Sequence, residues 1–426
     1  MSSSSSKSSS SSHEIILTSS PHGAITAYDT TSGTVLARFT GSLSPRHGLV
    51  LAGKAYIAAS HICPDTASAS IHLYNWWSST AFHHLPVPEP VAPLAATPDG
   101  SFLFAGGLSG EVYALAIPSG NISSSFRAHT APVSCLRISN DCSLLISGGD
   151  DGVIAVMPIL QLVDASSCCK DKNSSNLLLH SFAAHNGPVT DIVCFKGFCH
   201  SNIISCSTDC TCRFWDLFSG TKLWAITFPC PISSIILDPT DEEFYAAGSD
   251  GLIYKALLKI GSREEARRAS ELTATWSHQK HGAGILSMVL VNKAKNLVSA
   301  SEDGSIYVWE TDRGQVIMVI GNNLESISDL LVAKGMMGDH VKGPGVKGEV
   351  KAGCGESVGV SCQQISRLAE DLTAHEDVLA VAARDRSRAI DMLESAIGVY
   401  EKLLELIVKE AKGSSSKNCE NKKDSI

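Results

Sequence analysis

The chain has 426 residues, which is enough for roughly two to four ordinary domains or for one large repeat architecture with appendages. Hydrophobic residues make up 44%, charged residues 18% and aromatic residues 6%, so a globular body is expected and a wholly disordered, collagen-like or coiled-coil chain is excluded. Lys and Arg number 34 against 43 Asp and Glu, which leaves no overall positive field to hold a phosphate backbone.

Apolar runs in the sequence stay well short of the roughly 20 residues that a membrane-spanning helix needs. The sequence opens on a serine tract instead of a basic stretch followed by an apolar one, so no secretory signal is recognised. We therefore expect a soluble, unsecreted protein. Its 14 cysteines are scattered along a long chain, which favours reduced thiols in the nucleus or cytosol over a disulfide framework.

The N-terminal residues 1–13 are almost all serine and bury too little apolar surface to fold, so we expect a disordered tail. Over residues 14–333, short runs rich in Val, Ile, Leu and Ala alternate with Gly, Asp, Asn and Pro turn signals, without a long helical period. This pattern predicts an all-β region.

One unit recurs through the all-β region: an apolar strand, a strand rich in Ser, Ala and Gly, an Asp-Gly-like turn, and a strand ending in an aromatic residue. Its clearest copies are Asn202–Asp216 and Asn296–Glu310. Neighbouring copies lie roughly 41 to 58 residues apart, and the longest gaps contain polar inserts that belong in surface loops. Aligning the seven copies makes these residues equivalent: Tyr28, Tyr74, Leu115, Met157, Trp215, Ala256 and Trp309.

The repeated unit resembles the WD40 repeat, a family that builds each propeller blade from four antiparallel strands. The resemblance implies that the strongest blades contain a buried, hydrogen-bonded tetrad of His, Ser, Asp and Trp. The other copies are degenerate, and we expect apolar packing to hold them instead. The matching residues are His185, Ser205, Asp209 and Trp215 in the fifth copy, His281, Ser299, Asp303 and Trp309 in the seventh, and a partial set, His129, Ser147 and Asp151, in the fourth, where Met157 replaces the tryptophan.

The same His, Ser and Asp trio recurs from copy to copy, as a structural network does and a catalytic triad does not. The sequence contains no nucleophile elbow, His-Glu-x-x-His or other motif with a mechanism to accompany the trio. We therefore predict a structural role for it, and we expect no catalytic residue, no cofactor and no metal ion.

The two ends of the all-β region complement each other. The first copy begins at its second strand, with Glu14, whereas Leu324–Val332 is a lone strand after the seventh copy. Pairing the two would close a ring and leave no unpaired inner edge. We predict a seven-bladed WD40 β-propeller over residues 14–333, closed by this C-terminal strand.

Beyond the ring, residues 334–360 are rich in Gly and Lys and are expected to form a flexible linker. Residues 361–412 predict a long α-helix, because Ser361 and Gln364 fit a capping box and apolar residues recur at coiled-coil spacing. A helix of that length needs a partner, and pairing with itself or docking on another protein is favoured over folding back. Residues 413–426 are expected to be a disordered tail. The apolar seam contains Ile365, Leu368, Leu372, Leu379, Ile390, Leu393, Ile397, Tyr400, Leu404 and Ile407.

A glycine- and lysine-containing segment, Gly48–Ala55, nearly matches a phosphate-binding loop. It lacks the final hydroxyl residue, and the chain continues as a strand where the motif requires a helix. We interpret Gly53 and Lys54 as a hairpin turn in the second blade and predict no nucleotide site.

Two groups of residues could suggest a metal ion. Cys206, Cys210 and Cys212 lack the paired spacings of zinc sites, and alternating strand faces would point the thiols in different directions. We interpret them as small buried hydrophobes. His83 and His84 lie beside several prolines, which favours an extended loop at the rim over a metal site.

An adjacent pair of tryptophans, Trp76 and Trp77, follows the aromatic position of the second blade. Because Tyr74 already fills that position, one tryptophan can be exposed as an interaction residue, with core packing as the alternative.

A finer resemblance rests on Ile16–Leu51, which contains the run Ser-Pro-Arg-His-Gly-Leu, followed by a degenerate seven-bladed ring, a Gly/Lys linker and a C-terminal helix. This arrangement resembles the WD-repeat subunit of the Rix-type complex of large (60S) ribosomal subunit assembly, over nearly the whole chain outside the serine tract. The resemblance implies a non-catalytic scaffold of the nucleolus and nucleoplasm that supports processing of a pre-rRNA internal spacer. It also implies a downstream role in cell proliferation and meristem development.

The partners implied by this resemblance are an α-helical-repeat scaffold subunit, an AAA-type remodelling ATPase and the pre-60S particle. The pI near 5.9 suits a particle-bound scaffold, so we expect no direct sequence-specific nucleic-acid binding and no membrane contact. The helix seam is the candidate interface, either with another subunit or in a homodimer.

The alternative function is a substrate receptor of a cullin-type ubiquitin ligase, or another protein-interaction platform. The adaptor-binding signature of such receptors resembles a Trp-Asp-x-Arg blade ending. In this sequence Trp215 and Asp216 are followed by Leu217 and Phe218, and the seventh copy places Arg313 one residue late.

Overall fold

The computed structural model describes residues 14–63, 69–163, 178–196, 202–217, 219–258, 272–276, 281–320 and 326–334. The expected N-terminal tail, most of the linker, the C-terminal helix and its tail lie outside these residues.

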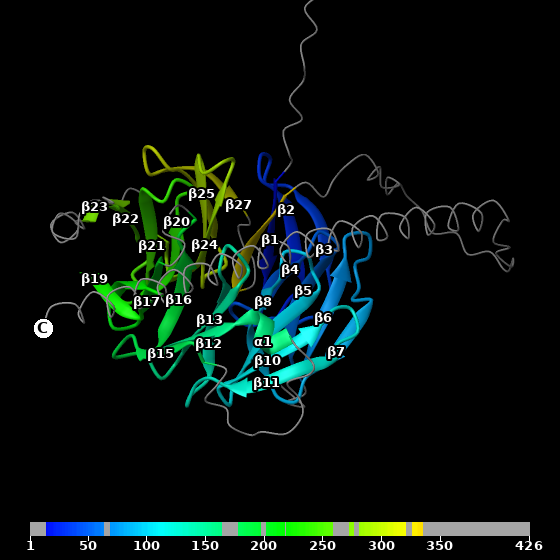
Figure 1. The fold of residues 1–426 in the computed structure, drawn as a ribbon. Coiled ribbons are helices and arrows are strands. Elements are labelled where there is room, and N and C mark those ends of the chain that lie inside the picture. The colour runs from blue at the N-terminus through cyan, green and yellow to red at the C-terminus, as the bar shows by residue number, and fades with distance from the viewer. Residues whose placement is uncertain are drawn as a thin grey trace, which may run out of the picture. The chain divides into compact units, whose positions relative to one another are not determined.

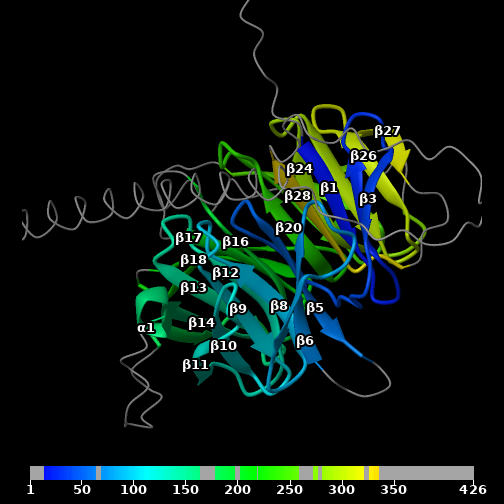
Figure 2. The ribbon, with the colours of Figure 1, turned by 90° about the vertical axis from the view of Figure 1, so that its right-hand side faces the viewer.

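The described residues form seven four-stranded antiparallel sheets, which are the blades of a propeller (Figures 1 and 2). The first strands of successive blades contact one another in a ring, in the order β4, β8, β12, β16, β20, β24, β28 and back to β4. Blade 1 contains β28 (Asp329–Lys334), β1 (Glu14–Ser19), β2 (Ile25–Asp29) and β3 (Val35–Phe39); blade 2 contains β4 (Leu49–Ala52), β5 (Tyr56–Ile62), β6 (Ala69–Asn75) and β7 (His83–Pro86); blade 3 contains β8 (Val91–Ala96), β9 (Phe102–Gly107), β10 (Glu111–Ala116) and β11 (Ile122–Arg127).

The remaining blades follow the same order from the channel outwards. Blade 4 contains β12 (Val133–Ile138), β13 (Leu144–Gly149), β14 (Val153–Pro158) and β15 (His180–Ala183), with the short helix α1 (Ile159–Val163) after β14; blade 5 contains β16 (Val189–Cys194), β17 (Asn202–Ser207), β18 (Thr211–Asp216) and β19 (Thr221–Thr227); blade 6 contains β20 (Ile232–Leu237), β21 (Glu243–Gly248), β22 (Ile253–Leu257) and β23 (Leu272–Trp276); blade 7 contains β24 (Ile285–Val291), β25 (Asn296–Ser301), β26 (Ile306–Glu310) and β27 (Gln315–Ile320).

The hydrophobic core is divided into layers between the blades. Each of the seven clusters of buried residues joins one blade to the next, including the cluster that joins blade 7 to blade 1. The second strands are buried over nearly their whole length because both of their faces pack against other blades. In the outermost strands β3 and β27, by contrast, every residue except the last is exposed or half-buried. The order of the blades therefore depends on apolar burial at every interface.

The turn between the second and third strands requires glycine in several blades. Gly152 has a φ of +75°, in the left-handed region, and an added Cβ would lie 2.4 Å from the carbonyl oxygen of His185 in the next loop. Gly110 is in the same situation, with a Cβ position 2.3 Å from the carbonyl oxygen of His129. These turns explain the recurring Asp-Gly-like signal in the sequence.

The repeat alignment made from the sequence is confirmed, because each of the seven aligned residues is the next-to-last residue of its blade's third strand. In five blades the register to the outer strand shifts immediately before that residue, at Tyr28, Leu115, Trp215, Ala256 and Trp309. A β-bulge at this point turns the end of the strand, so the position is equivalent in geometry as well as in sequence.

The predicted closure of the ring is confirmed. Strand β28 pairs antiparallel with β1, with Val332 opposite Ile16, and the sheet order places β28 at the inner edge of blade 1. The strand spans Asp329–Lys334 and not Leu324–Val332. Directly before the strand, Ser328 donates its backbone N–H to the Ser19 carbonyl oxygen over 2.9 Å.

Two local expectations have different outcomes. Gly53 and Lys54 form the turn between β4 and β5, with a φ of +62° at Gly53, as predicted. The expected rim loop at His83 and His84 is instead β7, the outer strand of blade 2. Pro86 ends that strand, and an outer edge tolerates proline because no further strand needs its missing N–H.

The helix α1 is short, and no helix among the described residues is long and apolar enough to cross a membrane.

Ile16→Ala tests the closing interface, since Ile16 is fully buried in the cluster between blades 7 and 1. Removal of the side chain leaves a cavity and is expected to lower the free energy of unfolding by about 2–5 kcal/mol, measured by urea denaturation. Leu160→Ala is the control, because Leu160 is 83% exposed on α1. Equal losses in the two variants would contradict the role assigned to this interface.

Candidate functional site

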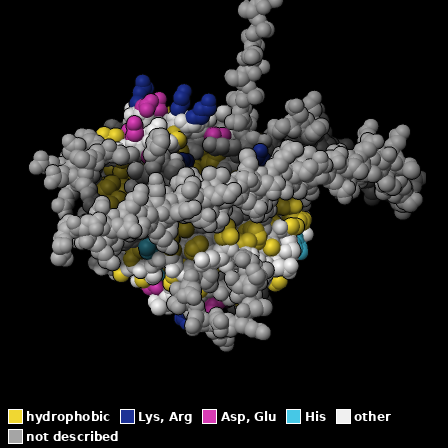
Figure 3. Space-filling model, in the orientation of Figure 1, with side chains coloured by type: hydrophobic (Ala, Val, Ile, Leu, Met, Phe, Trp, Pro, Cys, Tyr) yellow, Lys and Arg dark blue, Asp and Glu magenta, His cyan; other side chains and the backbone are white. Residues whose placement is uncertain are grey.

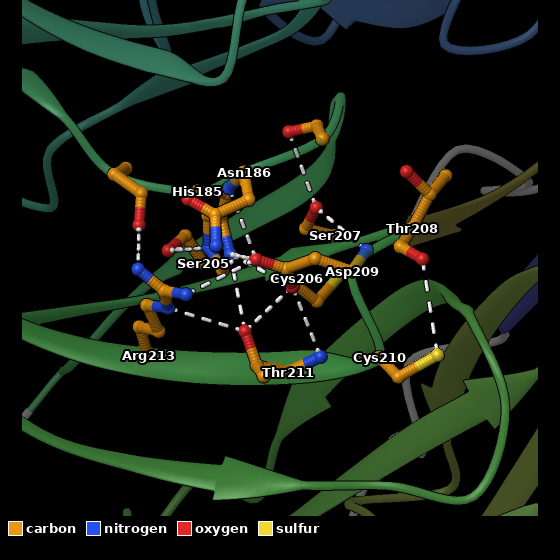
Figure 4. A network of polar contacts seen from close by, with 12 residues as sticks. His185, Asn186, Ser205, Cys206, Ser207, Thr208, Asp209, Cys210, Thr211 and Arg213 are labelled. Carbon is orange, nitrogen blue, oxygen red and sulfur yellow. Dashed lines mark hydrogen bonds and ion pairs between the residues drawn. The ribbon is translucent and has the colours of Figure 1, made fainter.

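The fifth blade contains a hydrogen-bond network around His185 (Figure 4). His185 Nδ1 lies 3.1 Å from Asp209 Oδ2, and His185 Nε2 lies 2.8 Å from Ser205 Oγ. Trp215 Nε1 donates to the same Ser205 oxygen over 2.9 Å. Because that oxygen accepts from the indole, its hydroxyl is free to donate to His185 Nε2, and His185 Nδ1–H then faces Asp209. A single chain of donors runs from Trp to Ser to His to Asp.

The elements of blade 5 place these side chains together. His185 lies in the loop before β16, Ser205 on β17, Asp209 in the following turn and Trp215 near the end of β18. The sequence aligned these residues as a tetrad, and the structure brings all four into contact.

Electrostatics support a structural role for the network. Burial lowers the pKa of His185 and, despite the opposing effect of Asp209, keeps the imidazole neutral near pH 7. Burial alone would raise the pKa of Asp209, but hydrogen bonds from Thr211 and Asn186 and the attraction of His185 outweigh it, so the pKa is lowered. Arg213 Nη2 also forms an ion pair with Asp209 Oδ2 over 3.2 Å. The carboxylate is thus held by protein donors, as in a network that rigidifies a core.

The fourth blade contains the partial network. His129 Nε2 lies 2.8 Å from Ser147 Oγ and His129 Nδ1 lies 3.1 Å from Asp151 Oδ1. Met157 occupies the tryptophan position and is fully buried in the cluster between blades 3 and 4. The serine therefore lacks the indole donor that its counterpart in blade 5 receives.

In the seventh blade one predicted contact is replaced. Ser299 Oγ lies 2.7 Å from His281 Nε2 and accepts from Trp309 Nε1 over 2.8 Å, as the alignment implied. His281 Nδ1, however, lies 2.8 Å from Ser305 Oγ, and no hydrogen bond among the described residues joins it to Asp303. Asp303 instead accepts from the backbone N–H of Ser305 over 2.9 Å. The Ser305 hydroxyl therefore takes the place of the Asp303 carboxylate as the partner of His281 Nδ1, and the predicted tetrad is incomplete in this blade.

The expectation that the degenerate blades are held by apolar packing alone is wrong for blades 3 and 6. In blade 3, Glu89 Oε1 accepts from Tyr113 Oη over 2.8 Å and Glu89 Oε2 accepts from the Ser109 backbone N–H over 2.8 Å. In blade 6, Asp250 Oδ2 accepts from Tyr254 Oη over 2.6 Å. A carboxylate and a tyrosine hydroxyl therefore replace the His-Ser-Asp network, a substitution that matching to the WD40 pattern does not detect.

A second candidate site lies in the central channel. The loop of residues 42–48, which we call the channel plug, leaves blade 1 and enters the channel before β4 begins. His47 Nε2 donates to the Thr190 carbonyl oxygen of blade 5 over 3.1 Å, and the Arg46 guanidinium donates to the Ser233 carbonyl oxygen of blade 6. The plug thus reaches blades on the far side of the channel.

Further hydrogen bonds attach the channel plug to nearer blades. The Leu94 backbone N–H of blade 3 donates to the His47 carbonyl oxygen over 2.8 Å. Ser328 Oγ, just before the closing strand, donates to the Ser44 carbonyl oxygen over 2.7 Å, and Ser44 N–H donates to the Ser20 carbonyl oxygen over 3.2 Å. His47 adopts a φ of 55°, so the chain turns sharply inside the channel. The plug fastens blades 1, 3, 5 and 6 to blade 2.

Charged side chains surround the plug. Arg137 Nη2 forms an ion pair with Asp191 Oδ1 over 2.8 Å, and Arg137 Nε donates to the Ile192 carbonyl oxygen over 2.8 Å. Asp191 Oδ2 also accepts from Ser234 Oγ over 3.0 Å and from the Ile235 N–H over 3.2 Å. Burial would raise the pKa of Asp191, but Arg137 and these donors outweigh it and lower the pKa. Asp191 is therefore a buried, ionised carboxylate.

A second buried carboxylate behaves differently. Asp329 Oδ1 accepts from Ser287 Oγ over 3.0 Å and from the Leu330 N–H over 2.8 Å. Burial outweighs these bonds and raises the pKa of Asp329 to about 6. Burial and the charge of Arg46 lower the pKa of His47 to about 3, so this imidazole is neutral. The channel contains one carboxylate that stays ionised and one that titrates close to neutrality.

Beyond the plug the channel continues as a chamber of about 330 Å³. Its walls come from the inner strands, and the lining surface is about equally apolar and polar; the polar lining includes His47, Arg137, Asp191, Ser234, Ser287 and Asp329. Asn140 and Lys196, which follow the ends of β12 and β16 by two residues, also line it and are exposed to solvent. The plug therefore bounds one end, and the chamber extends to the opposite face of the ring.

Sequence reasoning did not assign a role to these channel residues. The signal that could have found the plug is the Ser-Pro-Arg-His-Gly run, which places a cation and an imidazole directly before the inner strand β4. Arg137, Asp191 and Asp329 carry the matching signal, because each is a charged residue in an inner strand that is mainly apolar.

The cysteines of blade 5 are arranged differently from the expectation. Cys206 and Cys212 lie opposite each other on β17 and β18 and share one face, because the register pairs them directly. Both are buried, and burial raises the pKa of Cys212 well above its ordinary value. Among the described residues no group of His, Cys, Asp and Glu side chains has the arrangement of a metal site.

The surface of the ring contains isolated large apolar side chains. Trp77 is 80% exposed, whereas Trp76 packs edge-on against Phe39, with ring centroids 6.3 Å apart. Figure 3 shows one face of the molecule, on which Lys and Arg gather together with Asp and Glu near the top of the view. The visible charge is thus mixed in sign, which fits contacts with proteins better than a continuous phosphate track.

Comparison with known proteins agrees with this geometry. The family described as "WD domain, G-beta repeat" matches residues 120–156, 176–216 and 271–310. Protein ROOT INITIATION DEFECTIVE 3 of Arabidopsis thaliana is 33% identical over 296 residues, which are 70% of this chain and 66% of that protein. Pre-rRNA-processing protein crb3/ipi3 of Schizosaccharomyces pombe is 24% identical over 319 residues, 69% of this chain and 70% of that protein. WD repeat-containing protein 18 of Homo sapiens is 24% identical over 308 residues, 71% of this chain and 68% of that protein.

The seven closed blades and the recurring histidine networks define a propeller of the WD40 class. Within that class, the chain belongs to the WD40-repeat proteins related to ROOT INITIATION DEFECTIVE 3, crb3/ipi3 and WD repeat-containing protein 18.

Ser205→Ala removes the acceptor of Trp215 and the partner of His185 together. Because the indole N–H of Trp215 and Nε2 of His185 are buried and then both lack a partner, the free energy of unfolding should fall by about 2–4 kcal/mol. Ser147→Ala is the matched variant in blade 4, where no indole contacts the serine, and should cost about half as much. Urea denaturation measures both, and an equal or larger loss for Ser147→Ala would contradict the donor chain.

Asp329→Asn tests the buried carboxyl group. Because the folded protein raises the pKa of Asp329 to about 6 from an ordinary value of 3.8, ionisation costs stability as the pH rises from about 4 to 6, and the cost stays constant above that range. Asn keeps the acceptor for Ser287 but does not ionise. The variant should match the wild type near pH 4 and be more stable by ~3 kcal/mol near pH 7.5. Thermal unfolding at the two pH values measures this, and a variant less stable at pH 7.5 would contradict the assignment.

Proposed function

We propose that this chain is a non-catalytic scaffold subunit of a nuclear complex that acts in large (60S) ribosomal subunit assembly and in the processing of a pre-rRNA internal spacer. The observation that carries the proposal is the similarity, over about 70% of this chain, to relatives that include a pre-rRNA-processing protein. The segment Ile16–Leu51, which carries the finer resemblance, contains the channel plug, so it has a distinct structural role in the ring.

The geometry of the ring supports a scaffold over an enzyme. The histidines of the networks are engaged inside the blades, His129 and His185 with a serine and a carboxylate and His281 with two serines, and their pKa values are lowered by burial. A neutral, buried imidazole that is already hydrogen-bonded on both sides has no free nitrogen for general acid or base catalysis. A ring of this kind is a rigid platform whose function lies in what binds to its faces.

The proposed partners are an α-helical-repeat scaffold subunit, an AAA-type remodelling ATPase and the pre-60S particle. We assign the main contact to the expected helix of residues 361–412, because its apolar seam has coiled-coil spacing. The same seam supports a homodimer if two copies of the helix pair. The proposed location is the nucleolus and nucleoplasm, and the proposed consequence of losing the protein is slowed proliferation in dividing tissue such as a meristem.

Affinity purification of the tagged full chain, followed by density-gradient sedimentation, tests the proposal. The full chain should migrate with large-subunit precursors and with a helical-repeat subunit. A chain ending at Gly359 should lose both if the helix is the interface. Leu404→Asp places a charge on the seam and should weaken recovery of the subunit at least tenfold, whereas Lys402→Asp places the same side chain off the seam and should not.

The alternative role as a ubiquitin-ligase receptor predicts a different result. In that role Arg313 would have to support adaptor binding. Its side chain is 71% exposed, and its Nε atom lies 3.8 Å from Glu310 Oε2. Recovery of a ligase adaptor that is lost with Arg313→Ala, and no recovery of ribosomal precursors, would overturn the proposed function.

A further inference from the structure

The chamber below the channel plug has the form of a binding site. Its volume of about 330 Å³ is at the lower end of the range for ligand pockets, about 300–1,000 Å³. The walls include Val50, Val193, Ile236, Val289 and Leu331, one from each of five inner strands. Aliphatic walls with a polar closed end fit a ligand that has a short apolar stem and a polar tip.

Arg137 provides the polar group that is available to a ligand. Its Nε and Nη2 atoms are used by Ile192 and Asp191, whereas its Nη1 has no hydrogen-bond partner among the described residues. The side chain is 41% exposed although it lies in an inner strand, and it lines the chamber. Because Asp191 fixes the guanidinium from one side, two N–H groups of Nη1 are held in place without a protein acceptor.

The charges that line the chamber leave a positive excess when Asp329 is protonated. Among the lining residues Arg137 and Lys196 are positive and Asp191 is negative. Outside the lining, Arg46 of the plug adds a positive charge near Asp329, and Asp241, which accepts the backbone N–H of Lys196 over 2.7 Å, adds a negative one. Asp329 carries a full negative charge only when the pH is well above 6. The neighbouring imidazole of His47 is neutral and the thiol of Cys194 is protonated, since burial raises its pKa to about 12. An additional anion in the chamber would balance this excess at low dielectric.

We propose that the chamber binds a peptide carboxylate, supplied by an acidic side chain or by a chain terminus, which enters at the mouth that Asn140 and Lys196 border and pairs with Arg137 Nη1. The guanidinium is the group best suited to a carboxylate, and Lys196 at the mouth attracts the same charge on entry. The aliphatic walls contact the methylene groups or neighbouring small residues of the peptide. This inference stands on the channel geometry and does not depend on the proposed function.

Other ligand classes fit the chamber less well. A cation would meet Arg137 and Lys196, two positive side chains. A phosphate group has more acceptor oxygens than a single free Nη1 can satisfy, and no helix N-terminus is present among the lining residues. A peptide carboxylate needs only the one charged partner that the chamber offers.

Protonation of Asp329 is coupled to binding. The groups that face it are Arg46 and His47 of the plug, Arg137 of β12 and Asp191 of β16, while β24 contributes Ser287. Of these groups Asp329 is the one that titrates near pH 6. An ionised Asp329 repels a bound carboxylate, so affinity should rise as the pH falls from 7.5 to 5.5, by roughly fivefold or more. A glutamate side chain, with an ordinary pKa of about 4.3, stays mostly ionised in this range.

Isothermal titration calorimetry of the full chain with three tetrapeptides tests the proposal. The first is blocked at both ends and carries one glutamate. The second is blocked at its N-terminus only, so that it has a free terminal carboxylate and no acidic side chain, and the third is blocked at both ends and carries glutamine in place of glutamate. At least one of the first two should bind, and the glutamine peptide should bind at least tenfold more weakly than that one. Which of the two binds more tightly identifies the source of the carboxylate.

Three variants connect binding to the chamber. Arg137→Gln should weaken peptide binding at least tenfold, whereas Arg127→Gln, which removes the same charge from the exposed outer strand β11, should leave it unchanged. Asp329→Asn keeps the hydrogen bond to Ser287 and should bind at pH 7.5 as tightly as the wild type does at pH 5.5, with little dependence on pH between them. Because asparagine removes the cost of ionising Asp329, this last variant is expected to stay folded even if Arg137→Gln does not.

Several results would overturn the inference. The first is that the glutamate and glutamine peptides bind equally while the peptide with a free terminus does not bind. The second is that binding survives Arg137→Gln in a folded protein. The third is that the Asp329→Asn variant keeps the pH dependence of the wild type. Absence of heat with both carboxylate peptides at millimolar concentration would overturn it as well.

Discussion

Pairing of β28 with β1 is the interaction on which the rest of the ring depends. Without it, β1 would present unpaired backbone groups at the inner edge of blade 1, and the apolar layer between blades 7 and 1 would lose Leu330. The closing strand also supplies Asp329 to the chamber and follows Ser328, which holds the channel plug. Closure of the ring, organisation of the channel and attachment of the plug are therefore consequences of one strand pair.

The blades meet the same physical requirement in different ways. Each must satisfy polar groups between packed strands, because an unpaired buried donor or acceptor is costly. Blade 5 uses His185, Ser205 and Trp215, whereas blade 3 uses Glu89 with Tyr113. The shape of the blade is retained because the apolar layers are common to all these solutions and because the turn keeps a positive φ, at Gly110 in blade 3 and at Cys210 in blade 5. Degeneracy of the repeat in sequence therefore does not mean degeneracy in structure.

The sequence predicted the number of blades, the equivalent position in each third strand and the closure of the ring, because strand periodicity and turn residues are local signals. The features that it missed depend on residues distant in the chain or on fine geometry. Ser305 replaces Asp303 at His281 because of where one hydroxyl points, and Arg46 contacts Ser233 across 187 residues of sequence. Short strands with few apolar residues, such as His83–Pro86, resemble loops in sequence since only their pairing identifies them. The C-terminal seam stays a prediction.

The position of the channel plug in the chain has a consequence for folding. Arg46 and His47 precede the blades that hold them, by 187 and 143 residues respectively. During synthesis from the N-terminus, blade 2 is therefore complete long before the acceptors at Ser233 and Thr190 emerge. Blade 2 can therefore form before the plug has its partners. The contacts that bridge the channel are made only after blades 5 and 6 have been synthesised, so the plug reports on completion of the ring.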